Sequence, residues 1–296
     1  MIMRVTQSML NNNMLRNISN SYSNMDQYMD QLSSGKKINR PSDDPVVAMK
    51  GVSYRSALTK VEQFERNISE VHNWMDNSDE TMDEANQALQ RTRELIIQAS
   101  NDTYEDNQRN NIGEEVEQLK EHLYDLANTK VNNKYIFNGT NTTEKRFNDD
   151  GTLKVDPPNN EAVMIEVSDG VKLQANVNPD NVFSKDMFDK LDEITQALED
   201  PNTTGEDLDN YLSDIDGFSQ GLINERADLG ARMNRVEMVE NRLGQQKVST
   251  TKLLSDNEDA DIEEVIMNLK MQESVHRASL AAGSRIIQPT LMDFLR

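Results

Sequence analysis

The sequence predicts a mainly α-helical protein in which long antiparallel coiled-coil helices from both termini are nested around a small β-rich insert. Three observations support this fold class. Two long segments repeat an apolar residue at every seventh position, and strand-like alternation is confined to the middle of the chain. The aromatic content of 5% and the charged content of 28% fit elongated helices better than one large globular core. Because a straight helix cannot keep a strict seven-residue repeat on one side, the repeat implies supercoiling against partner helices.

The first element is an amphipathic helix that ends near Gly35. Its apolar residues recur at steps of three and four and therefore share one face, while the opposite face is almost entirely polar. These residues are Leu15, Ile18, Tyr22, Met25, Met29 and Leu32. Gly35 stands where a left-handed helix cap is favoured. In the following turn, Pro41-Ser42-Asp43-Asp44-Pro45, we expect Ser42 or Asp43 to cap the next helix and Pro45 to lie in its first turn.

The second helix is expected to run from Pro45 to Ala99, about 80 Å at ~1.5 Å per residue. Its seven-residue repeat is unbroken and consists of Tyr54, Val61, Ile68, Met75, Met82, Leu89 and Ile96. A polar break at 101–107 predicts the tip of a helical hairpin. A third helix then carries Ile112, Val116, Leu119, Leu123 and Leu126 on one face.

Strand signals mark an insert at about residues 132–183. The stretch 135–139 predicts a short strand that ends at a glycine. Apolar residues alternate over 163–167 and again over 171–177, on either side of Ser168-Asp169-Gly170. Two alternating runs around Asp-Gly are the strongest hairpin signal in the chain.

Helical patterns return after Ser184, first with Phe188, Leu191, Ile194 and Leu198 on one face. After a loop at 201–205, a helix from Tyr211 onward again repeats every seven residues, at Leu222, Leu229, Val236, Leu243 and Thr250. We expect it to lie antiparallel to the helix at 45–99.

The C-terminal segment carries a second amphipathic face. It consists of Met271, Val275, Ala278, Ala282 and Ile286, followed by Leu291, Phe294 and Leu295. The nested order predicts three parts: residues 1–40 with 256–296 as a terminal coiled-coil assembly core, 41–131 with 184–255 as a long helical bundle, and 132–183 as a small β-rich insert.

The two terminal faces are predicted to form an assembly interface. Burying about six apolar side chains does not offset the conformational entropy lost when about thirty residues become ordered. Each end therefore needs a partner. Two arrangements satisfy this need: the ends pair with each other and close a bundle, or they stay loose in the monomer and become ordered on assembly.

Composition and motifs exclude several functional classes. A net charge of −21 argues against a nucleic-acid partner, because phosphates repel such a surface. The chain has no Cys, no apolar run long enough for a membrane span and no recognisable signal peptide. His72, His122 and His276 lie in helical runs without a second ligand, and the acidic stretch 256–261 lacks the pattern of an EF-hand. With no catalytic motif either, the sequence predicts no enzyme, metal site or cofactor.

Two stretches resemble the terminal signatures of the bacterial flagellin superfamily. They are Leu32-Ser33-Ser34-Gly35-Lys36-Lys37-Ile38-Asn39-Arg40-Pro41-Ser42-Asp43-Asp44-Pro45 and the C-terminal run from Asp259-Ala260-Asp261-Ile262-Glu263-Glu264 to Phe294-Leu295-Arg296. Three features are more similar to the hook-filament junction members than to flagellin itself: the turn at 41–45, the stretch 134–140 and the stretch 229–235. The resemblance covers about 1–140 and 220–296.

The resemblance implies a structural adaptor that joins the flagellar hook to the flagellin filament and is required for filament assembly and motility. It implies hook-associated protein 1, flagellin and further copies of this chain, in a ring of a tubular stack, as partners. It also implies a flagellar export chaperone, export by the flagellar type III apparatus without a cleaved signal peptide, and an extracellular place at the hook-filament junction. The alternatives are a flagellin that forms the filament itself and a cytoplasmic coiled-coil scaffold with the insert as a ligand-binding module.

Overall fold

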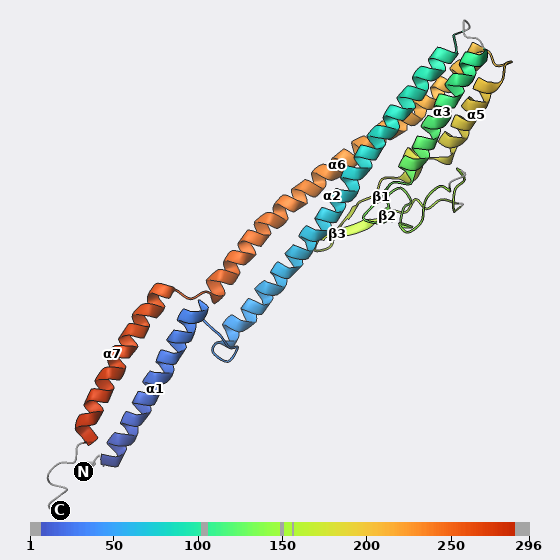
Figure 1. Cartoon of the computed structure of the whole chain (residues 1–296). Helices are drawn as coiled ribbons and strands as arrows, with labels where there is room; N and C mark the ends of the chain where they lie inside the picture. The colour runs from blue at the N-terminus through green and yellow to red at the C-terminus, as the bar shows by residue number, and fades with distance from the viewer. Residues whose placement is uncertain (1–6, 102–105, 149–150, 156, 288–296) are drawn as a thin grey trace, which may run out of the picture. The chain divides into compact units, whose positions relative to one another are not determined.

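The computed structural model describes residues 7–101, 106–148, 151–155 and 157–287 (Figure 1). The chain divides into two compact units, which we name the terminal unit, Met1–Lys60 with Gln246–Arg296, and the central unit, Val61–Gln245. The predicted fold class is confirmed, since long helices pack against one another and the strands are confined to the middle of the chain. Within the described residues, no helix is both long and apolar enough to cross a lipid bilayer.

The central unit is built on most of α2 (Pro45–Ala99) and most of α6 (Gly205–Glu258), which run antiparallel (Figure 1). Residues 45–60 of α2 and 246–258 of α6 belong to the terminal unit. Arg226 of α6 donates to Asp79 and Asp83 of α2, with Nε–Oδ1 and Nη1–Oδ1 distances of 2.9 and 2.6 Å. Further along, Arg93 donates to Asp216 at 2.6 Å. These pairs hold the register of the two helices from their outer faces.

The seven-residue repeats form the seam between α2 and α6, as predicted. The buried members are Val61, Ile68, Met75, Met82, Leu89 and Ile96 of α2 and Leu222, Leu229, Val236, Leu243 and Thr250 of α6. Tyr54 is half-buried. Each repeat position that was predicted between 61 and 250 therefore lies in the seam, which is the packing expected of a supercoiled pair.

A second helix pair completes the core of the central unit. The helix α3 (Asp106–Ala127) packs against α5 (Lys185–Glu199), and Figure 1 shows the two side by side. Ser184 caps α5 by accepting a hydrogen bond from the Met187 backbone N–H at 3.1 Å. The predicted apolar faces of both helices are buried, with Leu119 only partly so. Residues 102–105 of the predicted break before α3 lie outside the described residues.

The insert contains two small antiparallel hairpins. The first pairs β1 (Lys130–Val131) with β2 (Lys134–Tyr135), through a turn in which Asn132 and Asn133 have φ of 48° and 68°. The second pairs β3 (Met164–Ser168) with β4 (Val171–Gln174), as predicted from the Asp-Gly turn. Its Gly170 has φ of 71°, a conformation that side chains other than glycine rarely adopt.

Two predicted element boundaries are wrong, and one short helix was not expected. The strand expected at 135–139 ends at Tyr135, because Asn138 donates to the carbonyls of Asn141 and Glu144 and closes a turn instead. The helix expected from Tyr211 already begins at Gly205, because Thr204 and Asp207 form a reciprocal capping box. The short helix α4 (Pro179–Val182), capped by the Asn178 side chain, was not expected.

Candidate assembly surface

The two ends of the chain pair with each other in the terminal unit. The helix α1 (Gln7–Ser34) runs antiparallel to α7 (Ile262–Ile287), as Figure 1 shows. Gln272 donates to the Ser21 hydroxyl at 3.1 Å, and the rings of Tyr22 and His276 lie 6.2 Å apart. The end of the Met14 side chain lies over Gly283 of α7, where a Cβ would displace it. Of the two arrangements expected from the sequence, the structure adopts the paired one.

The pairing leaves most of the predicted apolar faces uncovered. On α1, Ile18 and Met25 are half-buried, whereas Leu15, Tyr22, Met29 and Leu32 are 38% to 63% exposed. On α7, Met271, Val275, Ala278 and Ala282 are all exposed. Ile286 belongs to α7, but its side chain is outside the described part, as are Leu291, Phe294 and Leu295 altogether. The helix pair therefore uses one side of each amphipathic face and leaves the other side to solvent.

Further exposed apolar residues of the terminal unit were not predicted from the sequence. On α2 they are Val46, Met49 and Val52, and on α6 they are Val248 and Leu253. The remaining ones are Met9 of α1 and Ile262, Ile266, Met267 and Leu280 of α7. The spacing of three between Val46, Met49 and Val52 is a signal that could have identified a second stripe, off the seven-residue repeat.

The apolar side chains of the two units differ sharply in burial. Among the described residues, Val265 is the one buried apolar side chain of the terminal unit, whereas the buried core lies in the central unit. Most of the large exposed apolar side chains lie in the terminal unit. Extensive exposed apolar surface of this kind marks an interaction site.

A groove runs between α1 and α7 and has a volume of about 360 Å³. Its lining consists of Met25, Met29, Leu32, Ser33, Leu269 and Glu273. Three of the six residues are predicted assembly residues, so the structure brings this part of the set together. An apolar groove along a helix pair has the form that accepts an amphipathic helix.

A cluster of polar contacts, which we name the polar clasp, joins the segment after α1 to the segment before α7, at one end of the helix pair. Gly35, with φ of 68°, ends α1 as predicted, and its carbonyl accepts from Ala260 N–H at 2.9 Å. Lys37 N–H donates to the Glu258 carbonyl at 2.6 Å, and Lys36 Nζ lies 2.6 Å from Asp259 Oδ1. The hydrogen bond from Lys36 lowers the pKa of the Asp259 carboxyl.

The carboxylate of Glu258 is the buried centre of this clasp. It accepts from Arg55 at 2.7 Å and lies over Gly51, where a Cβ would clash with it. A buried carboxylate is tolerated only when it is paired in this way. Because α2 contributes Gly51 and Arg55, the clasp fixes the start of α2 against the end of α6 within the terminal unit.

Two aspartate side chains stabilise the turn at 41–45, one by capping α2 and the other by closing the turn itself. Asp44 caps α2, since its Oδ1 accepts from Val46 and Val47 N–H at 2.9 and 3.1 Å. The expected caps, Ser42 and Asp43, are therefore wrong, because the helix begins at Pro45 and its cap is the residue just before. Asp43 instead closes the turn by accepting from the N–H groups of Arg40 and Asn39, which lowers its pKa.

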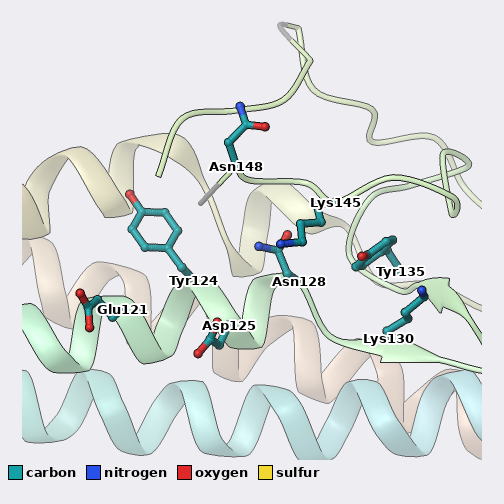
Figure 2. A pocket seen from close by; sticks show the side chains of 8 residues that line it. All are labelled: Glu121, Tyr124, Asp125, Asn128, Lys130, Tyr135, Lys145 and Asn148. Carbon is teal, nitrogen blue, oxygen red and sulfur yellow. The ribbon is translucent and has the colours of Figure 1, made fainter. Parts of the chain in front are cut away.

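The central unit carries a separate polar pocket of about 520 Å³ beside the insert. Figure 2 shows the side chains around it, from the end of α3, the first hairpin and the loop that follows: Glu121, Tyr124, Asp125, Asn128, Lys130, Tyr135, Lys145 and Asn148. The Tyr124 ring stacks on Phe188 with centroids 4.0 Å apart. Burial raises the pKa of Tyr124 to about 12, so this phenol stays protonated at neutral pH and is no general base there.

The three histidines occupy unrelated positions. His72 pairs with Glu240 across α2 and α6 at 3.1 Å, His122 is exposed on α3, and His276 packs between α7 and α1. In the described part of the chain, no group of three or more His, Cys, Asp or Glu side chains is arranged to hold a metal ion.

Comparisons with known proteins match both terminal regions of the chain to flagellin families. Residues 5–142 match the family described as bacterial flagellin N-terminal helical region, and residues 212–295 match the bacterial flagellin C-terminal helical region. Flagellar hook-associated protein 3 of Escherichia coli K12 is 26% identical over 303 residues, which cover 95% of this chain and 96% of that protein. Flagellin of Bacillus subtilis 168 is 24% identical and covers 94% of each chain.

Solved structures show the same fold. A putative flagellar hook-associated protein from Vibrio parahaemolyticus superposes with a TM-score of 0.68 at 18% identity, covering 73% of this chain and all of that one. Flagellar hook associated protein-3 from Legionella pneumophila gives a TM-score of 0.62 at 16% identity over 69% of this chain and 97% of its own. At these identities the likeness concerns the fold alone.

Proposed function

This chain belongs to the bacterial flagellin family and is a flagellar structural protein, and from that premise we propose that it joins the hook to the filament. The observation that carries the proposal is the exposed apolar surface of the terminal unit. Similarity over nearly the full length to two proteins named flagellar hook-associated protein 3, at 26% and 25% identity, supports the junction role.

Burial of the exposed apolar surface of the terminal unit against neighbouring subunits would lower the free energy of the assembly. The large apolar side chains on it are about half exposed, and fully burying each gains roughly 1.5–3 kcal/mol. A dozen such side chains, buried by the remaining half, supply on the order of 10–20 kcal/mol, which exceeds the cost of many stable associations. Assembly therefore removes from water a surface that α1 and α7 cannot cover by themselves.

The proposed neighbours are hook-associated protein 1 on one side, flagellin on the other, and copies of this chain in a ring. A ring inside a tubular stack needs heterologous contacts, in which different faces of a subunit meet. The terminal unit offers different apolar faces: the groove between α1 and α7, the stripe of Met271 and Val275 on α7, and the stripe of Val46, Met49 and Val52 on α2.

We propose that the protein is exported through the flagellar type III apparatus to an extracellular place at the junction. The weak burial of the terminal unit favours such export. Within its described residues, the pair of α1 and α7 buries one large apolar side chain, so little burial opposes its opening and the pair is easily unfolded. An export chaperone that covers exposed apolar helices before export would also prevent premature association.

Deletion of the gene, followed by immunolabelling of whole cells, tests the proposal. We expect the deletion strain to keep its hooks, to release flagellin monomers into the medium and not to swim, and we expect antibody on complemented cells to mark the hook-filament junction. Normal filaments on the deletion strain would contradict the junction role.

A second candidate is a flagellin of the filament, because the Bacillus subtilis flagellin matches this chain over nearly its full length. Abundance separates the two. A filament subunit would dominate a preparation of sheared filaments, whereas a junction protein would be a trace component of it.

A further inference from the structure

The chain has sixteen methionines, and those that the structure describes range from fully buried to largely exposed. Met75, Met82 and Met187 lie in the core of the central unit with 1% exposure or less. In the terminal unit the exposed methionines are 57% to 70% accessible, and they are Met9, Met29, Met49, Met267 and Met271. Two more, Met164 and Met238, are exposed in the central unit. The surface that is proposed to bind neighbours is thus unusually rich in accessible thioether groups.

We propose that the exposed methionines of the terminal unit are sites of reversible oxidation to methionine sulfoxide, and that their oxidation in the free subunit blocks assembly. The oxidant is a peroxide or a hypohalous acid. With hydrogen peroxide, the thioether sulfur attacks one peroxide oxygen, and an S–O bond forms as the O–O bond breaks. The released hydroxide takes the proton from the oxygen that is now bound to sulfur, so the products are the sulfoxide and water. Sulfur loses two electrons and the peroxide gains them. Methionine sulfoxide reductases reverse this modification.

The position of these sulfur atoms explains why oxidation acts on assembly and not on the fold. Met29 lines the groove between α1 and α7, and Met271 lies on the stripe of α7 that also carries Val275. A sulfoxide is polar, and burying it without a hydrogen-bond partner is unfavourable. In the free subunit the same sulfoxide stays in water, because each of these side chains is more than half exposed. The consequence for assembly rests on the proposed function, whereas the accessibility of the sulfur atoms does not.

Peptide mass spectrometry of the purified full chain, treated briefly with hydrogen peroxide, tests the sites. We expect Met29, Met267 and Met271 to be oxidised at least about tenfold faster than Met75 and Met82, and the rates to converge when the chain is unfolded in denaturant. Equal rates in the native and the unfolded chain would overturn the assignment of the sites.

Binding of the protein to hooks of the deletion strain tests the consequence. Purified protein, untreated or peroxide-treated, is added to the cells, and the bound amount is measured by immunoblot after washing. We expect treatment to weaken binding about tenfold or more. Leucine keeps the volume and the apolar character of methionine, so replacing all five exposed methionines of the terminal unit by leucine should preserve binding after treatment. These are Met9, Met29, Met49, Met267 and Met271. Loss of binding by the treated variant would overturn the proposal.

The matched control replaces Met164 and Met238, which are equally exposed but lie in the central unit, by leucine. This variant should stay as sensitive as the wild type, and protection by it would overturn the proposal, as would undiminished binding of treated wild-type protein. If untreated wild-type protein does not bind, the junction role fails, and the oxidation rates then decide the sites by themselves.

Discussion

Replacing Leu32 by aspartate is expected to abolish assembly while leaving the free protein folded. Leu32 lines the groove between α1 and α7 and is still 38% exposed in the monomer. Covering the exposed remainder of a leucine gains roughly 0.6–1 kcal/mol, and burying a carboxylate or its protonated form at the same place costs about 1–3 kcal/mol. The two effects together weaken each contact by roughly 2–4 kcal/mol, or about 30- to 700-fold in the association constant.

The melting temperature of the purified variant should stay close to that of the wild type. The reason is that the buried apolar core lies in the central unit, to which Leu32 does not belong. Filament formation by the variant in the deletion strain measures assembly, and calorimetry of the monomer measures stability.

The matched control is Ile97→Asp. Ile97 is 45% exposed on α2 in the central unit, so the same kind of substitution is made at similar exposure away from the terminal unit. We expect this variant to form normal filaments. Normal filaments with Leu32→Asp, or a large loss of monomer stability in that variant, would refute the reasoning.

Three further outcomes follow from the central unit and its contrast with the ends. Leu229→Ala should destabilise the monomer by about 2–5 kcal/mol in chemical denaturation, because Leu229 is fully buried in the seam of α2 and α6. The raised pKa of Tyr124, about 12 in the folded chain, means that its contribution to stability is complete below the ordinary pKa of ~10 and is lost as pH rises from about 10 to 12; Tyr124→Phe should remove this decline in alkaline unfolding experiments. Amide hydrogen exchange should be slow around Ile68 and Val236 and much faster in 7–37 and 260–287, and uniformly slow exchange would count against an assembly role for the ends.

The long helices were predictable because the seven-residue apolar repeat in the sequence directly reflects the packing of one helix against another. A seven-residue repeat such as Val61, Ile68 and Met75 is selected only where each step faces a partner, and α6 supplies that partner with its own repeat. The bounds of α2 were predicted to the residue, because Pro45 fixes its start and the polar break at 101–107 follows its end. The start of α6 was missed, although Thr204 and Asp207 spell a capping box in the sequence.

The candidate surface was predictable only in part. Periodicity tells which residues share a face, but it does not tell whether another helix covers that face. Leu15 and Ile18 belong to the same predicted stripe, yet Ile18 is half-buried and Leu15 is exposed to solvent. The stripe of Val46 and Met49 escaped notice because the stronger repeat of α2 lies beside it. The assembly role of either stripe, and the three-part division of the chain, stay predictions.

In this chain the apolar residues that stabilise the fold are largely different from those that are proposed to drive assembly. Because the core of the central unit is closed, its stability is independent of neighbours, and substitutions there change the free energy of unfolding first. In the terminal unit, apolar side chains such as Tyr22 and Met271 contribute little until another chain covers them. A substitution can therefore stop assembly without any change in the folded monomer, and measuring monomer stability alone would miss it. Deciding between the two effects requires both measurements on the same variant.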